Sequence, residues 1–210
     1  MKFGEKVEGY TIPVLNEREI RAAAGILFLL LYTSLMLIIF KTNFALLKYS
    51  IIVFFIDFII RVFVNPKFAP SLILGRLIVS RQNPEYVGAA QKKVAWIIGV
   101  SLALVMFILM VVLNTYSVIT GIICLLCLIF LFFESVFGIC LGCLVYKWYY
   151  KEKAQYCPGE VCEVKSRQPI QHTSIAQLAI LLCLAGLVVI MALFFNGLLN
   201  TVPTDLWKKF

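Results

Sequence analysis

Five apolar stretches, each long enough to cross a lipid bilayer, constrain the fold of this chain more than any other feature of its sequence. They cover about residues 22–40, 44–64, 94–113, 118–146 and 175–199. A helix needs roughly 20 apolar residues to cross about 30 Å of hydrocarbon. Hydrophobic residues make up 62% of the chain and charged residues 14%, a balance too apolar for a water-soluble domain. We therefore predict one integral membrane domain over residues 1–210.

All five stretches are predicted to be helices, because an open strand edge would leave backbone groups unpaired in hydrocarbon. The alternating pattern of a membrane barrel is absent. The predicted fold class is an all-α membrane protein with five transmembrane helices. Residues 41–43 and the NTYS segment at 114–117 are short enough to form tight turns, whereas 65–93 and 147–174 are long connections.

The connection 65–93 contains a short apolar segment, Ser71 to Val79, directly after Pro70. Proline is favoured in the first turn of a helix, and nine residues are too few to cross the bilayer. Since Arg76 interrupts the apolar surface, we expect a short interfacial helix in the cytoplasmic headgroup region. The alternative is a re-entrant piece packed among the spans.

Basic residues predict which side of the membrane each connection faces. They are frequent before the first span and in the connections 65–93 and 147–174, and sparse on the other side. We therefore expect a bacterial inner membrane protein with a cytoplasmic N-terminus and a periplasmic C-terminus. The net charge of +8 is then explained by anionic membrane lipids as partners, with no nucleic acid.

Three charged side chains lie in the cytoplasmic halves of the predicted spans, and a charge costs about 2.5–3.5 kcal/mol at a helix centre. Asp57 and Arg61 are four residues apart in the second span and should pair on one helix face. Glu134 lies in the fourth span, also in its cytoplasmic half. One interpretation is a structural ion-pair cluster that joins the two spans, and the other is a binding or proton-relay site below the cysteines.

Seven cysteines fall into two groups. Cys124, Cys127 and Cys183 lie within apolar spans and are interpreted as small hydrophobic residues, with Cys127 kept as an extra candidate because it shares a helical stripe with Glu134. The other group is Cys140-Leu-Gly-Cys143, expected on the last turns of the fourth span, and Cys157-Pro-Gly-Glu-Val-Cys162 in the following connection.

The four cysteines Cys140, Cys143, Cys157 and Cys162 allow several chemistries if they converge at the cytoplasmic face. The CxxC pair and the CPGEVC pair together suit thiol–disulfide exchange or sulfane-sulfur transfer. The same four residues are also a candidate zinc or iron–sulfur ligand set, although their spacing differs from the usual zinc ribbon. Structural disulfides are disfavoured in a reducing cytosol. A packing role without chemistry stays open, and so does the cofactor, which is either absent or one of these metal centres.

Several segments together resemble a known family. They are VLNEREIRAAAG, FFIDFIIRVFVNPKFAPSLILGRLIV, NPEYVGAAQKKVAW, FFESVFGICLGCLVY and QYCPGEVCE, within residues 13 to about 163. They are similar to a family of bacterial integral membrane proteins catalogued as a domain of unknown function and associated with thioredoxin-like or rhodanese-like proteins. The resemblance implies sulfur or redox traffic and a thioredoxin-like or rhodanese-like partner, with Cys140, Cys143, Cys157 and Cys162 as the matching site positions. Asp57, Arg61 and Glu134 would form the embedded polar support.

The sequence therefore predicts a membrane-embedded thiol redox or sulfane-sulfur transfer protein, with enzyme activity as a thiol–disulfide oxidoreductase or sulfur relay left open. An oxidoreductase would pass electrons from the thiols to a quinone through a pocket open beside Cys140. The alternatives are a zinc-stabilised or iron–sulfur-stabilised scaffold that docks a soluble partner, and a transporter of a small sulfur compound. Trp96 and other aromatic residues near span ends are interpreted as interfacial anchors.

Overall fold

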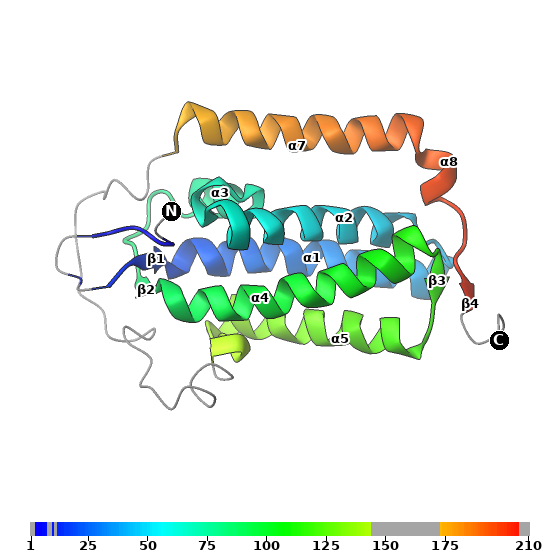
Figure 1. The fold of residues 1–210 in the computed structure, drawn as a ribbon, viewed down its shortest axis with the longest axis horizontal. Helices are drawn as coiled ribbons and strands as arrows, with labels where there is room; N and C mark the ends of the chain where they lie inside the picture. Colours follow the sequence, from blue (N-terminus) through cyan, green and yellow to red (C-terminus); the bar gives the residue numbers. More distant parts are fainter. Residues whose placement is uncertain (1–2, 8–9, 11, 144–172, 206–210) are drawn as a thin grey trace.

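The protein is mostly helical, and its computed structural model describes residues 3–7, 10, 12–143 and 173–205. Between the long helices lie short strands and short helical segments (Figure 1). In chain order the elements are β1 (Val14–Asn16), α1 (Glu17–Lys41), α2 (Ala45–Ile59), η1 (Ile60–Val64), η2 (Pro66–Phe68), α3 (Pro70–Ile78), β2 (Tyr86–Gly88), α4 (Ala89–Met106), η3 (Phe107–Val112), β3 (Thr115–Tyr116), α5 (Val118–Phe132), η4 (Phe133–Phe137), α7 (Ile175–Phe194), α8 (Asn196–Leu199) and β4 (Thr204–Asp205).

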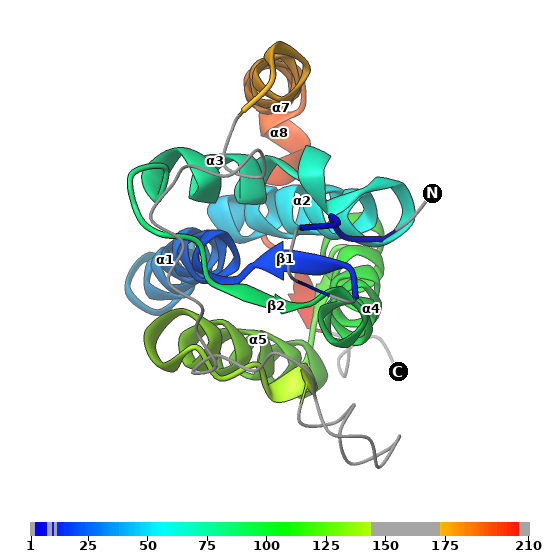
Figure 2. The same cartoon turned by 90° about the vertical axis from the view of Figure 1, so that its left-hand side faces the viewer.

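Four helices form the bundle. The chain packs α1 against α2 and α5, and α4 against the same two helices, so that they close a ring around an apolar core (Figures 1 and 2). The core includes Leu27, Leu31, Ile51, Phe54, Met106 and Leu128. α7 lies outside this ring and contacts α3 and η2, while the short α8 reaches α2.

Four helical segments in the described part of the chain are long and apolar enough to cross a membrane. They are Glu17–Lys41, Ala89–Val112, Val118–Phe137 and Ile175–Phe194. The stretch predicted as the second span, residues 44–64, is also helical, as α2 followed directly by the π-helical segment η1. It is set apart by Lys48, Asp57 and Arg61, which spread three charges along its length, whereas the charged residues of α1 lie near its two ends.

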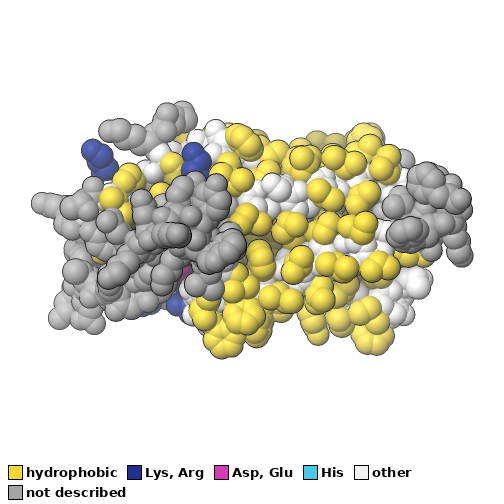
Figure 3. Space-filling view, turned by 60° about the horizontal axis from the view of Figure 1, so that its bottom comes forward, with side chains coloured by type: hydrophobic (Ala, Val, Ile, Leu, Met, Phe, Trp, Pro, Cys, Tyr) yellow, Lys and Arg dark blue, Asp and Glu magenta, His cyan; other side chains and the backbone are white. Residues whose placement is uncertain are grey.

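The outer surface of the bundle is apolar. Large hydrophobic side chains such as Leu29, Val112, Leu125 and Leu193 are each more than half exposed. Figure 3 shows hydrophobic side chains over the middle of the molecule, with Lys and Arg side chains near the end that carries β1 and β2. Soluble monomers do not expose apolar patches of this extent, so the surface is consistent with a membrane protein.

The first helix begins five residues earlier than the predicted span. The Asn16 side chain accepts a hydrogen bond from the Arg18 N–H (3.2 Å) and so caps the helix. Glu17 and Glu19 occupy the first turn, where carboxylates suit the helix dipole. The predicted turn after this helix is confirmed: Thr42 takes the left-handed conformation at φ 50° and the chain re-enters a helix at Ala45.

The fourth span ends earlier than predicted. Its helical segment stops at Phe137 because Gly138 takes a left-handed conformation at φ 66°, which a glycine adopts without steric cost. Cys140 and Cys143 therefore follow the helix instead of lying on its last turns, as the sequence analysis expected.

The short connecting helix α3 lies across one end of the bundle and packs against α1 (Figures 1 and 2). Its approach is close, because a Cβ atom at Gly75 would lie 2.5 Å from the backbone oxygen of Glu19. Leu74 and Ile78 remain exposed, whereas Arg76 is buried. α3 thus resembles the packed alternative more closely than a helix that only touches headgroups.

Two short strand pairs, which the all-α expectation did not include, lie at opposite ends of the bundle (Figure 1). β1 and β2 pair antiparallel, with Leu15 opposite Val87, and β3 and β4 pair parallel. Each pair joins segments distant in sequence, so neither has the local alternating pattern that predicts a strand. We call the end with β1 and β2 the charged end and the end with β3 and β4 the neutral end.

Candidate functional site

A lysine and two glutamates form the centre of the charged end. Lys92, at the start of α4, is 1% exposed, and its Nζ lies 2.8 Å from Oε2 of Glu17 on α1. The same Nζ donates to Oε1 of Glu134 on η4. One ammonium therefore holds two carboxylates from different helices, and removal of any member would leave a charge buried without its partner.

A second ion pair fastens α3 to α1. Arg76 Nη2 lies 3.1 Å from Oε2 of Glu19, and both side chains are buried. Glu19 Oε1 also accepts a hydrogen bond from the Asn16 amide (3.0 Å). The sequence analysis treated Arg76 as an interfacial residue and assigned no role to Glu19.

The predicted pairing of Asp57 with Arg61 is confirmed. Arg61 Nε donates to Asp57 Oδ2 at 2.7 Å, and both side chains are almost completely buried. Asp57 Oδ1 accepts the Ser71 backbone N–H (2.8 Å), and the Ser71 hydroxyl bridges Asp57 and Arg61. This cluster fixes the start of α3 on α2 and η1, and it does not include Glu134, which is bonded to Lys92.

Cys140 and Cys143 lie in one turn beside the lysine. The Cys143 N–H donates to the Cys140 carbonyl (2.9 Å), and the Cys143 side chain is close enough to affect the Cys140 thiol. Gly142 rests against α4, since a Cβ there would be 2.4 Å from the Ala95 Cβ. The turn is thus held against the bundle with its two sulfur atoms adjacent.

The hydrogen bond with Cys143 and burial raise the pKa of the Cys140 thiol well above its ordinary value, and the Lys92 ammonium only partly opposes them. A raised pKa keeps this sulfur protonated at neutral pH, so Cys140 is a weak nucleophile in the reduced protein.

The other predicted site cysteines, Cys157 and Cys162, lie outside the described residues. Within the part of the chain that the structure describes, no three His, Cys, Asp or Glu side chains are grouped closely enough to hold a metal ion. The convergence of four thiols and the metal alternative therefore both stay predictions.

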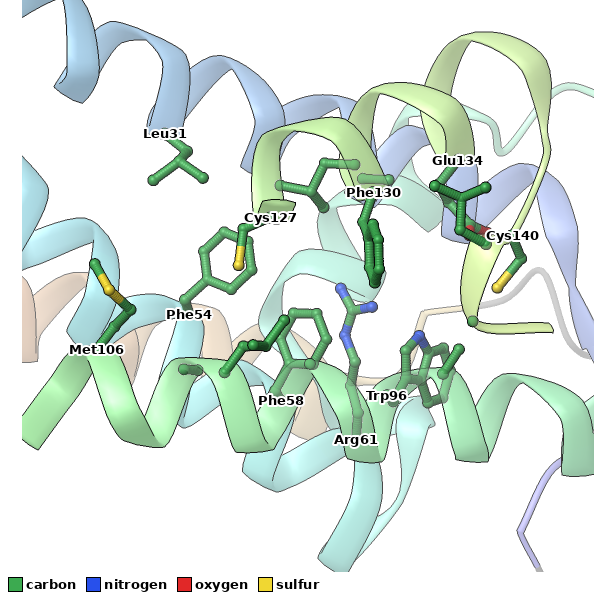
Figure 4. Close-up of a pocket in the computed structure, with 18 of the residues that line it drawn as sticks. Leu31, Phe54, Phe58, Arg61, Trp96, Met106, Cys127, Phe130, Glu134 and Cys140 are labelled. Atoms are coloured by element: carbon green, nitrogen blue, oxygen red, sulfur yellow. The ribbon is translucent and has the colours of Figure 1, made fainter. Parts of the chain in front are cut away.

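An apolar cavity of about 100 Å³ runs through the bundle towards this turn. Its inner part is bordered by Leu31, Ile51 and Met106, and its other end by Glu134 and Cys140. Figure 4 shows the Arg61 guanidinium pointing into the cavity between Phe58 and Trp96, with Phe130 facing it from α5.

Trp96 is 5% exposed and stacks near the Arg61 guanidinium, 5.2 Å from the ring centre. The expectation that it is an interfacial anchor was therefore wrong, because the helix begins at Ala89 and carries Trp96 into the bundle. Cys124 and Cys127 also border the cavity, whereas Cys183 is exposed on α7.

Sequence reasoning missed Lys92, which binds Glu134, and Glu17, the second carboxylate on the same ammonium. Lys92 was counted as one of the basic residues of a loop, and Glu17 as part of a polar stretch before the first span. The signal was present in the Asn16 cap followed by Glu17 and Glu19, which predicts that the helix starts before its apolar part.

Comparison with known proteins gives one match. The family described as Domain of unknown function (DUF4395) matches residues 15–151, which is more than half of the chain and includes the charged end, the cavity and the Cys140 turn. No curated protein and no solved structure matches the chain.

Proposed function

The chain belongs to the DUF4395 family, and we propose that it is a membrane-embedded thiol–disulfide oxidoreductase whose reacting pair is Cys140 and Cys143. The observation that carries this proposal is the adjacency of the two thiols in one turn, next to the buried Lys92 ammonium and the Glu134 carboxylate. A CxxC pair of this kind can close into a disulfide, since residues three apart in a helical turn have Cα atoms within about 4.4–6.8 Å.

The proposed reaction is an exchange of two electrons and two protons with a soluble dithiol protein. In the oxidised protein, a partner thiolate attacks the Cys140–Cys143 disulfide and forms a mixed disulfide. The second partner thiol then releases the partner as its own disulfide, and Cys140 and Cys143 leave as two thiols. We assign the mixed disulfide to Cys143, because Cys140 faces the cavity and the partner approaches from water.

The partner that fits this chemistry is a thioredoxin-like or rhodanese-like protein of the cytoplasm. Cys157 and Cys162 enter the proposal on sequence grounds alone, as a second pair that passes electrons between the partner and the Cys140 turn. A sulfane-sulfur relay through the same thiols is the variant of this function in which a persulfide, rather than a disulfide, is transferred.

The membrane arrangement that we propose has five spans, with α2 and η1 as the second. The buried ion pair of this helix supports it, because Asp57 and Arg61 neutralise each other and so lower the cost of placing charge in the bilayer. The charged end faces the cytoplasm of a bacterial inner membrane, and α3 lies at the cytoplasmic boundary. Basic residues near this end, including Arg18, Arg81 and Lys93, support the orientation.

The test is oxidation of the purified full chain in lipid nanodiscs with diamide, followed by denaturation, alkylation and mass spectrometry. We expect Cys140 and Cys143 to lose alkylation together and to regain it after addition of a reduced thioredoxin-like protein. Cys183, which is exposed on α7, should remain alkylated throughout and serves as the internal control.

The matched variant is Cys140→Ser, in which Cys143 should stay alkylated after oxidation because its partner is missing. If both cysteines of the unmodified chain remain alkylated after oxidation, the dithiol proposal is wrong. One zinc or iron atom per chain in elemental analysis would instead support the metal-stabilised scaffold.

A further inference from the structure

The cavity inside the bundle has no role in the dithiol exchange described above. Protein interiors are packed closely, with few voids larger than a water molecule, and ligand sites are mostly apolar cavities with a few converging polar groups. This cavity extends from Leu31 and Met106 in the bundle core to Cys140 at the charged end. It therefore has the features of a site for an amphiphilic molecule.

Aromatic rings form the walls near the polar end of the cavity. Phe54 and Phe58 on α2 are stacked with ring centres 5.2 Å apart and planes 9° from parallel. Trp96 and Phe130 border the same space from α4 and α5 (Figure 4). Flat rings on several sides favour a flat ring in the ligand, because offset stacking contributes beyond the burial of apolar area.

Arg61 supplies the polar contact. Its Nε donates to Asp57 and its Nη2 to Ser71, and the side chain also borders the cavity. The guanidinium lies 4.7 Å from the Phe58 ring centre and points into the cavity (Figure 4). A ligand oxygen beside the guanidinium would accept a hydrogen bond from this buried side chain, an arrangement typical of buried polar groups.

The charge balance decides between a neutral and an anionic ligand. Asp57 already neutralises Arg61 at 2.7 Å, and the Glu134 carboxylate borders the same end of the cavity. The carboxylate of a fatty acid would thus enter a region without excess positive charge, at a high desolvation cost. A neutral carbonyl group carries no such cost.

We infer that this cavity binds a membrane quinone, with the quinone ring beside Phe58, Trp96 and Phe130, one carbonyl oxygen accepting a hydrogen bond from Arg61, and the isoprenoid tail along Leu31 and Met106. The binding site stands on the cavity alone, whereas its use as an electron acceptor rests on the proposed oxidoreductase function.

In the redox step the quinone oxidises the thiol pair that borders the cavity. The S–H bonds of Cys140 and Cys143 break and one S–S bond forms, which releases two electrons and two protons. The quinone takes up both electrons and both protons and becomes a quinol. The step is balanced without another reactant, and it regenerates the disulfide that accepts electrons from the soluble partner.

Binding can be measured independently of redox chemistry. In the full chain carrying Trp148→Phe and Trp207→Phe, Trp96 is the remaining tryptophan. We expect a benzoquinone with a ten-carbon alkyl tail to quench its fluorescence saturably in nanodiscs, and decanoic acid at the same concentration not to relieve the quenching.

Ala103→Phe fills the cavity from α4 and should weaken quinone binding at least tenfold. Val105→Phe places the same ring on the exposed side of the same helix and should leave binding unchanged. Cys127→Phe fills the cavity from α5 and replaces the first variant if that variant does not fold. Equal affinity in the filled and control variants, or displacement by decanoic acid, would overturn the assignment.

A second measurement separates this inference from the proposed function. Under anaerobic conditions each quinone reduced should be accompanied by the loss of two alkylatable thiols, at Cys140 and Cys143. Quinone binding without thiol oxidation would support the quinone-binding site and refute the oxidoreductase function. The opposite result is a chain that does not bind quinone but forms a disulfide with diamide and exchanges it with thioredoxin. That result would support the oxidoreductase function and refute the quinone-binding site.

Discussion

The two ends of the bundle each bury a lysine, but they hold it in different ways. At the charged end, the Lys92 ammonium lies between the carboxylates of Glu17 and Glu134. At the neutral end, Lys48 is equally buried and donates to Asn114 Oδ1 and to the Thr201 backbone oxygen, both at 2.7 Å. The same residue type thus serves once as the counterion of two acids and once as a donor to uncharged oxygens.

This difference has an energetic consequence. Loss of one partner of a buried ion pair leaves the other charge without compensation, at about 3–5 kcal/mol. A lysine that contacts only neutral acceptors can be replaced at a lower cost. The hydrogen bonds of the lysine are lost, but so is the cost of burying its ammonium, and no charged partner is left behind. The charged end should therefore be sensitive to single substitutions and the neutral end tolerant of them.

The largest effect is expected for Lys92→Met. Two carboxylates would remain buried without a cation, and the free energy of unfolding should fall by about 3–5 kcal/mol. The free energy of unfolding can be measured by adding a denaturing detergent to the protein in mixed micelles. Lys93→Met is the matched control, because Lys93 is exposed, and recovery of stability in Lys92→Met with Glu17→Gln would confirm the electrostatic cause. A loss as large in the control would contradict it.

A somewhat smaller loss is expected for Asp57→Ala. Arg61 would lose its counterion and Ser71 its acceptors, at about 2–4 kcal/mol for hydrogen bonds to a buried charge. Because Ser71 starts α3, protease cleavage after Arg81 should also become faster. Glu85→Ala, which removes the partly exposed pair with Arg18, should change stability by about 0–1 kcal/mol. Equal effects of the two substitutions would refute this ranking.

At the neutral end, Lys48→Met should cost about 1 kcal/mol or less. The variant loses the bonds to Asn114 and Thr201 but leaves no carboxylate uncompensated, and the methionine fills similar volume. The same unfolding assay measures it beside Lys92→Met. A destabilisation as large as that of Lys92→Met would show that the two ends do not differ as described.

The smallest effect is expected for Ser34→Ala. Ser34 and Ser50 share a hydrogen bond of 2.8 Å between α1 and α2, and such bonds in membrane bundles contribute about 0.6 kcal/mol on average. Thr33→Ala, whose hydroxyl bonds only within its own helix, is the control. A loss above about 2 kcal/mol for Ser34→Ala would place this bond outside the range observed for such contacts.

The helices and one buried pair could be predicted from the sequence, because both depend on local spacing. The length of the apolar stretches predicted the long helices, and a separation of four residues predicted that Asp57 lies beside Arg61. The Lys92 cluster could not be predicted in this way, since its members come from three helices and lie up to 117 positions apart. The end of the fourth span was missed because the apolar run continues beyond Gly138, and only backbone geometry shows the stop.

The candidate site also has one part that local spacing predicts and another that depends on tertiary packing. Pairing of Cys140 with Cys143 follows from their spacing, whereas the cavity beside them depends on how four helices close around Phe58 and Trp96. Hydropathy identifies Trp96 as aromatic near a span end and cannot tell an inward ring from an interfacial one. The orientation of a helix about its own axis, which decides this, is set by tertiary packing.

The isolation of α7 bears on how the protein assembles. Gln177 is the buried residue of this helix and donates to the Lys67 carbonyl (2.7 Å), and the DUF4395 match ends before the helix begins. Membrane proteins first insert stable helices and then associate them laterally. α7 has the length and apolarity for insertion but few contacts with the ring of four helices. In a membrane, acyl chains would therefore be its principal solvent, and the ring would not need α7 in order to assemble.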